Sequence, residues 1–274
     1  MRVRITIRTR SSVFEEGGRV RRRAKCLAVL LTLCAMLLCG TLTNRRSGEQ
    51  RRYMPVVLMY HLVEETPFTE NEELFVTPED FEAQLRALSA AGYSFLFADG
   101  YGPTDTPSVV LTFDDGYEDN YTTALPLLQK YGAKATVFVA VNLLGREHYL
   151  TERQVCALAD SGCVRIGSHT MNHARLGELD AETVAAELAE SQAALEAMTG
   201  QSVRALAYPS GSFNAAAAQT AAAYYDAAYT IRSPLVFTRY SAATIPRINV
   251  TRGMSADALL SRVEKAGQML TELR

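Results

Sequence analysis

Val-Val-Leu-Thr-Phe-Asp-Asp-Gly-Tyr occupies residues 109–117, where an apolar run ends in two carboxylates and a glycine. A continuous apolar run is typical of a buried parallel strand, and the C-terminal tip of such a strand opens on the binding face of an α/β fold. Asp114 and Asp115 stand at this tip, so they are the first candidates for site chemistry. A polar turn after a strand is the structural alternative.

A second polar segment, Gly-Ser-His-Thr-Met-Asn-His at residues 167–173, follows the short β-like run Val-Arg-Ile. If the backbone turns helically there, the spacing of four residues places the imidazoles of His169 and His173 on one face. Two histidines and one carboxylate make a metal site with open positions. A surface helix is the alternative for a lone histidine pair, but two such motifs at strand ends favour the metal site.

The rest of the chain alternates strand and helix patterns. The expected strands are residues 55–60, 94–97, 109–113, 134–139, 164–167, 204–208, 227–231 and 244–250. The expected helices lie between residues 77 and 92, 120 and 131, 151 and 162, 180 and 200, 214 and 225, and 255 and 273. Because strand–helix–strand units connect parallel strands with one handedness, this alternation predicts a parallel α/β barrel.

Three motifs together resemble the polysaccharide deacetylase (NodB-homology) family of carbohydrate esterases. They are Thr-Phe-Asp-Asp-Gly-Tyr at 112–117, Ser-His-Thr-Met-Asn-His at 168–173 and Ala-Tyr-Pro-Ser-Gly at 207–211. Three motifs in the family's order are far more specific than any one of them, and the resemblance runs from about residue 55 to the C-terminus. It implies a distorted parallel (β/α) barrel with fewer than eight regular units.

By the same resemblance, Asp115, His169 and His173 are expected to bind one divalent metal ion. Zinc is the first expectation, with cobalt, nickel and manganese as alternatives. Asp114 is expected to be the general base. This division makes chemical sense, because a carboxylate bonded to a cation loses basicity and a second carboxylate must then take the proton of the attacking water.

Tyr-Pro-Ser-Gly at residues 208–211 follows another expected strand, and its proline and glycine force a loop whose backbone N–H groups can face a pocket. In the family an N–H of this loop completes the oxyanion site; Ser210 is the matching position, with Tyr208 beside it as a substrate contact. Many members have an arginine that braces the catalytic aspartate where this chain has Ala207. Arg247 is the candidate to supply that brace, and a structural salt bridge is its alternative role.

Many members take the proton donor for the leaving amine from a histidine near the C-terminal end of the domain, and this chain has none there. His61 follows the expected strand 55–60. Some relatives resemble this arrangement, with the acid-bearing segment at the front of the domain, so His61 is the expected general acid. A polar residue at a strand end is the alternative for His61, and His148 on a loop is a weaker candidate.

The chain has 274 residues and a formal net charge of −2. Residues 1–52 hold 13 of the 28 basic residues and 3 of the 30 acidic ones, so the remaining residues carry a net charge of −12. Nucleic acid is not an expected partner, because phosphate binding needs a basic surface. Cys156 and Cys163, the two cysteines outside the N-terminal part, do not imply a disulfide framework.

The N-terminal part has the charge pattern of an export signal. Residues 1–25 are rich in arginine and precede an uncharged apolar run at 26–43, about the length that spans a bilayer. We therefore expect a basic cytoplasmic N-terminus (1–25), a transmembrane anchor or signal segment (26–43), a linker (44–53) and an exported deacetylase domain (54–274). Cleavage of the leader would release the domain, and a buried core helix is the alternative for the apolar run.

These observations predict a metal-dependent hydrolase that removes N-acetyl groups from a cell-envelope or secreted polysaccharide. Poly-N-acetylglucosamine and peptidoglycan are the expected substrates, so the expected partners are an acetylated glycan polymer and, through the N-terminal segment, the membrane. An O-acetyl polysaccharide esterase and an inactive carbohydrate-binding protein on the same scaffold are alternatives. An iron oxygenase would also use two histidines and a carboxylate, but its close His-x-Asp pair is absent from the sequence.

Overall fold

The computed structural model describes residues 52–236 and 239–272. The expected basic N-terminus at 1–25, the apolar segment at 26–43 and the linker up to residue 51 lie outside these residues. Among the helices of the described ranges, none has both the length and the apolar character that crossing a membrane requires.

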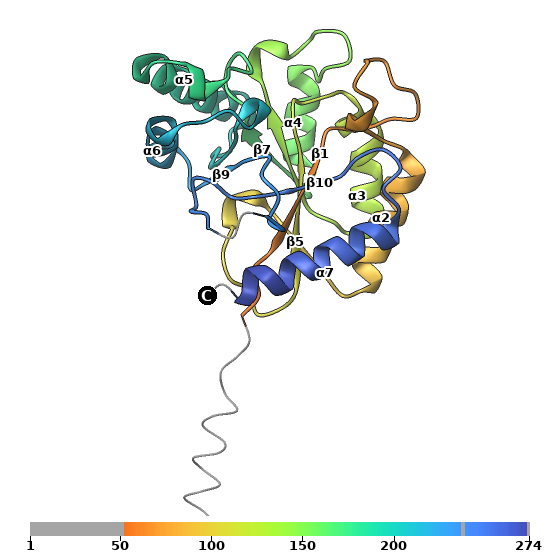
Figure 1. Ribbon diagram of the computed structural model, residues 1–274. Helices are drawn as coiled ribbons and strands as arrows, with labels where there is room; N and C mark the ends of the chain where they lie inside the picture. The colour runs from red at the N-terminus through yellow and green to blue at the C-terminus, as the bar shows by residue number, and fades with distance from the viewer. Residues whose placement is uncertain (1–51, 237–238, 273–274) are drawn as a thin grey trace, which may run out of the picture. The chain divides into compact units, whose positions relative to one another are not determined.

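A single parallel sheet organises the domain, with the strand order β10-β1-β5-β6-β7-β8-β9 and β4 paired to β5 (Figure 1). The strands are β1 (Val56–Tyr60), β4 (Ser94–Leu96), β5 (Ser108–Phe113), β6 (Ala135–Val139), β7 (Val164–Ser168), β8 (Ala205–Ala207), β9 (Ala227–Tyr229) and β10 (Ile248–Asn249). The two ends of the sheet meet at an isolated parallel bridge between Tyr229 and Ile245 rather than through paired strands. The predicted distorted (β/α) barrel with fewer than eight regular units is confirmed.

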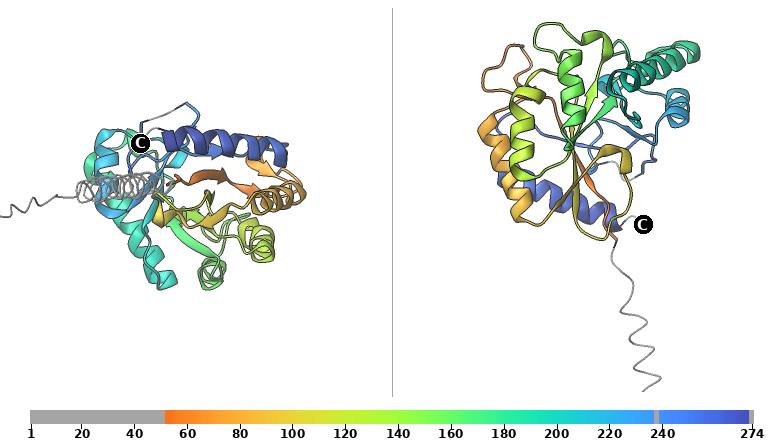
Figure 2. Two further views of the ribbon diagram at one scale, coloured as in Figure 1. Left: turned by 90° about the horizontal axis from the view of Figure 1, so that it is seen from below. Right: turned by 180° about the vertical axis from the view of Figure 1, so that it is seen from behind.

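Helices pack around the outside of this curled sheet, as the views in Figure 2 show. They are α2 (Pro78–Ala90), α3 (Leu125–Tyr131), α4 (Glu152–Asp160), α5 (Ala181–Thr199), α6 (Ala215–Tyr224) and α7 (Ala256–Glu272). Four of them begin where the sequence predicts, because the side chains of Thr77, Thr151, Asp180 and Asn214 accept backbone N–H groups of the first helical turn. The expected helix at 120–131 begins with a π-helical turn, Asn120–Ala124.

A second, two-stranded parallel sheet joins β2 (Leu62–Val63) to β3 (Phe75–Val76), and no pattern in the sequence predicts it. Strands of two residues are too short to show an alternating pattern. This small sheet closes the base of the loop between β2 and β3, directly after β1.

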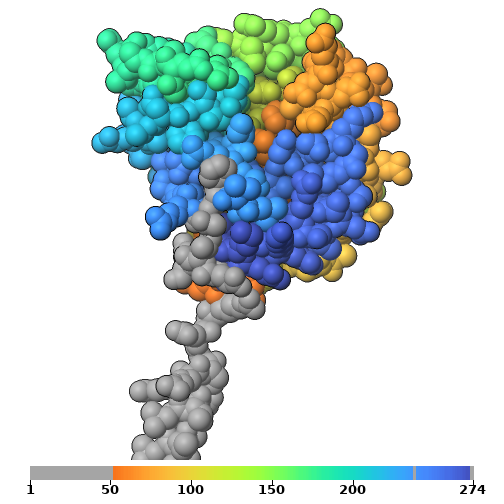
Figure 3. Space-filling model, viewed as in Figure 1, coloured from red at the N-terminus to blue at the C-terminus, as the bar shows by residue number. Residues whose placement is uncertain are grey.

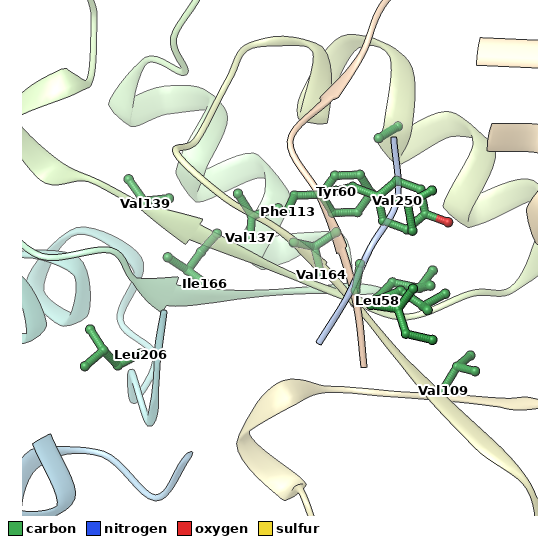
Figure 4. Close-up of a cluster of buried hydrophobic side chains, with 14 of the residues drawn as sticks. Leu58, Tyr60, Val109, Phe113, Val137, Val139, Val164, Ile166, Leu206 and Val250 are labelled. Atoms are coloured by element: carbon green, nitrogen blue, oxygen red, sulfur yellow. The ribbon is translucent and has the colours of Figure 1, made fainter. Parts of the chain in front are cut away.

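The central strands are buried on both faces, which explains their continuous apolar runs. Alternate residues face outward and pack beneath the helices, including Leu58, Phe113, Val137 and Ile166 (Figure 4). The residues between them form a separate cluster inside the barrel, namely Val57, Ala98, Val110, Phe138, Ala205, Ala207, Ala227, Tyr229 and Ile245. The barrel interior is therefore a packed core rather than a channel.

Gly167 on β7 lies at a tight point of this interior. A Cβ atom at this position would lie 2.4 Å from Cδ1 of Phe138, on the neighbouring strand, and 3.2 Å from the carbonyl oxygen of Ala205. Phe138 is fully buried, so its ring has no open space to move into. Only glycine fits between β6 and β8 at this level.

Gly167→Ala is therefore expected to lower the free energy of unfolding by about 1–3 kcal/mol, the usual cost of overpacking a core. Urea denaturation measures this loss. Gly100→Ala is the matched control, because a Cβ atom there has nothing within 4 Å. Similar stabilities of the two variants would contradict the packing argument.

Candidate metal centre and catalytic site

The candidate site residues lie where β1, β5 and β7 end, at one edge of the sheet. Asp114 and Asp115 follow β5, and Asp115 adopts a left-handed backbone conformation with φ of 76° before Gly116 at 79°. This sharp turn sends the two adjacent carboxylates into different surroundings. The N–H of Asp114 still donates to the carbonyl oxygen of Tyr60 at 3.0 Å, which ties this turn to the end of β1.

Asp115, His169 and His173 converge on one point. Oδ1 of Asp115 lies 3.2 Å from Nε2 of each histidine, and the candidate ligand atoms all lie within 4.8 Å of one another. Nδ1 of His169 donates to the carbonyl oxygen of Ala207 at 2.8 Å, so Nε2 is the ring nitrogen that faces Asp115 and the candidate ligand atom. Two imidazoles and one carboxylate oxygen in this arrangement fit a divalent metal ion.

Burial and hydrogen bonding act in opposite directions on the Asp115 carboxyl. Burial acts to raise its pKa, but hydrogen bonds from His169 and His173 outweigh this effect and hold the pKa well below the ordinary value. Asp115 is therefore ionised at neutral pH, which is the state that a metal ligand requires.

The histidines do not share a helical turn, which corrects the expectation from their spacing. Thr170 and His173 both have positive φ angles, 68° and 54°, so the segment forms an irregular loop after β7. Glu187 on α5 holds this loop: its Oε2 accepts the backbone N–H groups of Met171 and Asn172 at 3.0 and 3.1 Å. Such backbone bonds let the loop keep both imidazoles on one side without a helix.

Glu187 supports the site although none of the sequence motifs contains it. It is buried with 8% exposure, and its Oε1 also accepts a hydrogen bond from the side chain of Asn172 at 2.5 Å. One signal was available, because Glu187 lies on the same face of α5 as the buried Val184 and Leu188. A carboxylate on the buried face of a helix needs polar partners in the interior.

Asp114 is paired with Arg247 by two hydrogen bonds, from Nη1 to Oδ1 at 2.7 Å and from Nη2 to Oδ2 at 2.6 Å. Arg247 is fully buried, and it also donates to Oγ1 of Thr112 and to the carbonyl oxygen of Thr230, both at 3.0 Å. Burial acts to raise the pKa of Asp114, but the charge and hydrogen bonds of Arg247 outweigh it and keep this pKa below its ordinary value. Arg247 thus occupies the bracing position proposed from the sequence.

His61 lies beside Asp114, because Tyr60 and Phe113 are paired in register and these two residues come next on their strands. Its Nδ1 atom is buried and has no hydrogen-bond partner among the described residues. Burial lowers the pKa of His61, and the negative charges of Asp114 and Asp115 partly oppose this shift. The front of the domain therefore brings an imidazole to the two aspartates.

Asp119 and Asn120 hold the segment that carries His61. Oδ2 of Asp119 accepts the N–H of Val63 at 2.5 Å, and Nδ2 of Asn120 donates to the carbonyl oxygen of His61 at 3.0 Å. Burial raises the pKa of Asp119 to about 7. The end of β1 is thus fixed from the β5 side through polar side chains.

Tyr208, Ser210 and His148 have different surroundings. Ser210 is exposed and has a positive φ of 54° within the turn Pro209–Gly211. The Tyr208 side chain is fully buried, and its hydroxyl donates to the carbonyl oxygen of Ala243 at 2.9 Å, so its substrate role stays a prediction. The ring of His148 stacks on Phe68 with their centroids 3.8 Å apart.

The Arg247–Asp114 pair leads to a stability prediction. Arg247→Ala leaves the Asp114 carboxylate buried without its partner, so we expect a loss of about 3–5 kcal/mol of unfolding free energy in urea denaturation. Arg204 supplies the control, because it pairs with Asp226 through two similar bonds, 2.5 and 2.9 Å, on the surface. Arg204→Ala should cost about 1 kcal/mol or less. Equal losses would show that burial does not set the strength of the Arg247 pair.

Fold and site define a (β/α)-barrel protein with a two-histidine, one-carboxylate group that could hold a metal ion, beside a buried aspartate–arginine pair. A family model described as polysaccharide deacetylase matches residues 101–227. YxkH of Bacillus subtilis (strain 168), a protein named for the polysaccharide deacetylases, is 31% identical over 217 residues, covering 76% of this chain and 75% of its own length. The chain belongs to the polysaccharide deacetylase family.

Solved structures agree with this assignment. The deacetylase PplD of Streptococcus pyogenes, solved in complex with acetate, has a TM-score of 0.69 and 30% identity over 77% of this chain and 98% of its own. A polysaccharide deacetylase from Bacillus cereus has a TM-score of 0.70 and 27% identity over 77% of this chain and 69% of its own.

A further relative is similar in sequence over part of its length. The poly-β-1,6-N-acetyl-D-glucosamine N-deacetylase of Staphylococcus epidermidis is 27% identical over 158 residues, covering 51% of this chain and 55% of that protein.

Proposed function

We propose that this protein is a metal-dependent hydrolase that removes N-acetyl groups from a cell-envelope or secreted polysaccharide. The observation that carries the proposal is the convergence of Asp115, His169 and His173 next to the buried Asp114–Arg247 pair. Poly-N-acetylglucosamine or peptidoglycan is the proposed substrate. The name of the Staphylococcus epidermidis relative supports the first of these, although the chain spans only about half of that protein.

The donor set supports zinc as the bound ion, with cobalt, nickel or manganese as alternatives, because imidazole nitrogen suits zinc and nickel and carboxylate oxygen suits manganese. A divalent ion held by Asp115, His169 and His173 would polarise the acetyl carbonyl and lower the pKa of a water molecule to about 7. The remaining tasks belong to residues outside this ligand set. They are to accept the proton of the water, to stabilise the charge on the acetyl oxygen and to protonate the departing amine.

Asp114 takes the proton of the attacking water in this proposal. Arg247 keeps the Asp114 carboxylate ionised and fixed in orientation through two hydrogen bonds. A backbone N–H of the turn at Ser210 stabilises the negative charge that develops on the acetyl oxygen. His61 gives a proton to the nitrogen of the departing amine. Burial lowers the pKa of His61, and the negative charges of the two aspartates oppose part of this shift.

Substitutions separate metal binding from proton transfer. Asp115→Ala, His169→Ala or His173→Ala should each lower bound metal and activity together, because a ligand is lost. Asp114→Asn should keep its metal and lose turnover by about 10²–10⁴-fold, the usual share of general base catalysis. Metal content by mass spectrometry and acetate release from N-acetylated and O-acetylated glycans measure both effects. Full activity of Asp114→Asn would remove it from the mechanism, and release from O-acetylated glycans alone would point to the esterase.

The role of His61 is tested through the leaving group. His61→Ala should retain metal and fold but lose orders of magnitude in turnover on an N-acetyl substrate, because the amine must be protonated as it departs. The loss should shrink on an aryl acetate ester, whose departure needs little protonation. Parallel assays on the two substrates give the comparison. An equal loss on both, or no loss, would assign His61 a structural role only.

We further propose that the domain works outside the cytoplasm and is anchored or exported by its N-terminal part. The basic block at residues 1–25 before the apolar run at 26–43 supports this topology. The full chain should fractionate with membranes, and protease added outside cells whose outer wall has been permeabilised should remove the domain beyond Asn44. Recovery of the intact protein from the cytosol would overturn the proposal.

A further inference from the structure

A row of aromatic rings leads from the metal centre to the surface. We call it the aromatic ridge, and its members are Phe68, Tyr117, His148 and Tyr149. Phe68 stacks on His148 with their centroids 3.8 Å apart and their planes 11° apart, and it lies 6.3 Å from the ring of Tyr117. Tyr117 in turn stacks on Tyr149 at 4.9 Å. Residues distant in sequence thus form one continuous row of rings, of which Phe68 and His148 are exposed.

One end of the ridge lies two residues along the chain from a candidate metal ligand, and the other is open to solvent. Tyr117 follows Asp115 by two residues and is buried, with 7% exposure. Phe68 is 37% exposed, and the side chain of His148 is 45% exposed. Among the described residues, no other phenylalanine or tyrosine side chain is exposed.

Two loops at the site end of the barrel build the outer part of the ridge. Phe68 comes from the loop between β2 and β3, and His148 comes from the segment between β6 and α4. The two loops stand next to each other at the top of the molecule in Figures 1 and 3, drawn in orange and light green. The stack of Phe68 on His148 joins these two loops into one wall, meaning a continuous raised surface, at the end of the barrel where β5 and β7 end.

This wall is held in place by the backbone. The carbonyl oxygen of His148 accepts the N–H of Glu118 at 2.8 Å, and Tyr117 and Tyr149 form an isolated antiparallel bridge. His148 has a positive φ of 68°, a conformation that costs free energy in a residue other than glycine and that clusters at functional sites. Phe68 rests edge-on against the buried Phe75 at 5.0 Å.

We propose that Phe68 and His148 form a subsite for a sugar ring next to the one whose acetyl group reacts. A pyranose ring has one or two apolar faces of C–H groups, and these faces pack on exposed aromatic rings, while its hydroxyl groups remain in water. An exposed aromatic pair continuous with the catalytic site suits a neutral acetylated glycan. This inference rests on the proposed function, and it identifies a second sugar unit of the polymer that the protein binds.

The subsite makes binding depend on chain length. In this proposal a monosaccharide occupies the catalytic site alone, whereas an oligosaccharide covers the ridge as well. Phe68→Leu removes the ring but keeps an apolar side chain, and His148→Asn removes the ring but tolerates the positive φ. Each should raise KM for an N-acetylglucosamine hexamer, relative to KM for the monomer or dimer, by about threefold to tenfold, the range for one aromatic contact.

The measurement uses the full, metal-loaded protein and N-acetylglucosamine oligomers of one to six units. Val236→Ala, at a side chain that is 71% exposed and outside the ridge, is the control and should leave the KM ratio as in the wild type. An unchanged KM ratio in both ridge variants would overturn the subsite. If the wild type releases no acetate from any oligomer, the proposed function fails, and titration calorimetry with the hexamer then decides the subsite: equal hexamer affinity in wild type and variants, or none, overturns it.

Discussion

The buried ion pair between Arg247 and Asp114 is the interaction on which the rest of the site depends. Removing two charges from water costs several kcal/mol for each ion, and only close geometry with further hydrogen bonds offsets that cost. Arg247 meets this condition, because four hydrogen bonds connect it to Asp114, Thr112 and Thr230. These partners lie on β5 or directly after β5 and β9, so the guanidinium joins opposite sides of the barrel where regular strand pairing between the sheet ends is missing. The same contact therefore supports the fold and fixes a carboxylate.

Two adjacent aspartates have different surroundings because the backbone turns sharply between them. Asp114 points toward the fully buried guanidinium, whereas Asp115 faces two histidines from the neighbouring loop. Each carboxylate is stabilised in its charged form against burial, one by a fixed cation and the other by imidazole hydrogen bonds. The left-handed conformation of Asp115 is the backbone strain that permits this division, and such strain persists only where the surroundings hold it.

The sequence predicted the parallel barrel, most strands and helix starts, and the residues that meet at the strand ends, because these features follow from local patterns. It did not predict what depends on distant contacts. The irregular loop from His169 to His173 is set by Glu187 on α5 rather than by the spacing of the histidines. The stack of Phe68 on His148 joins two loops that are about eighty residues apart, and neither loop shows a pattern that pairs it with the other. Arg247 became a candidate because this chain has Ala207 at the position where many family members have the bracing arginine. Its other partners, Thr112 and Thr230, gave no signal in the sequence.

The position of His61 follows from the order of strands rather than from the order of the chain. β1 lies between β5 and β10, so the residue after β1 is the direct neighbour of the residue after β5. Arg247, just before β10, reaches the same carboxylate from inside the barrel. In a curled sheet whose ends nearly meet, a strand at the front of the chain and a segment near its end can therefore serve one aspartate. Such a scaffold can supply a histidine from the first strand without moving the candidate metal ligands, because β6 and β7 lie on the opposite side of β5 from β1.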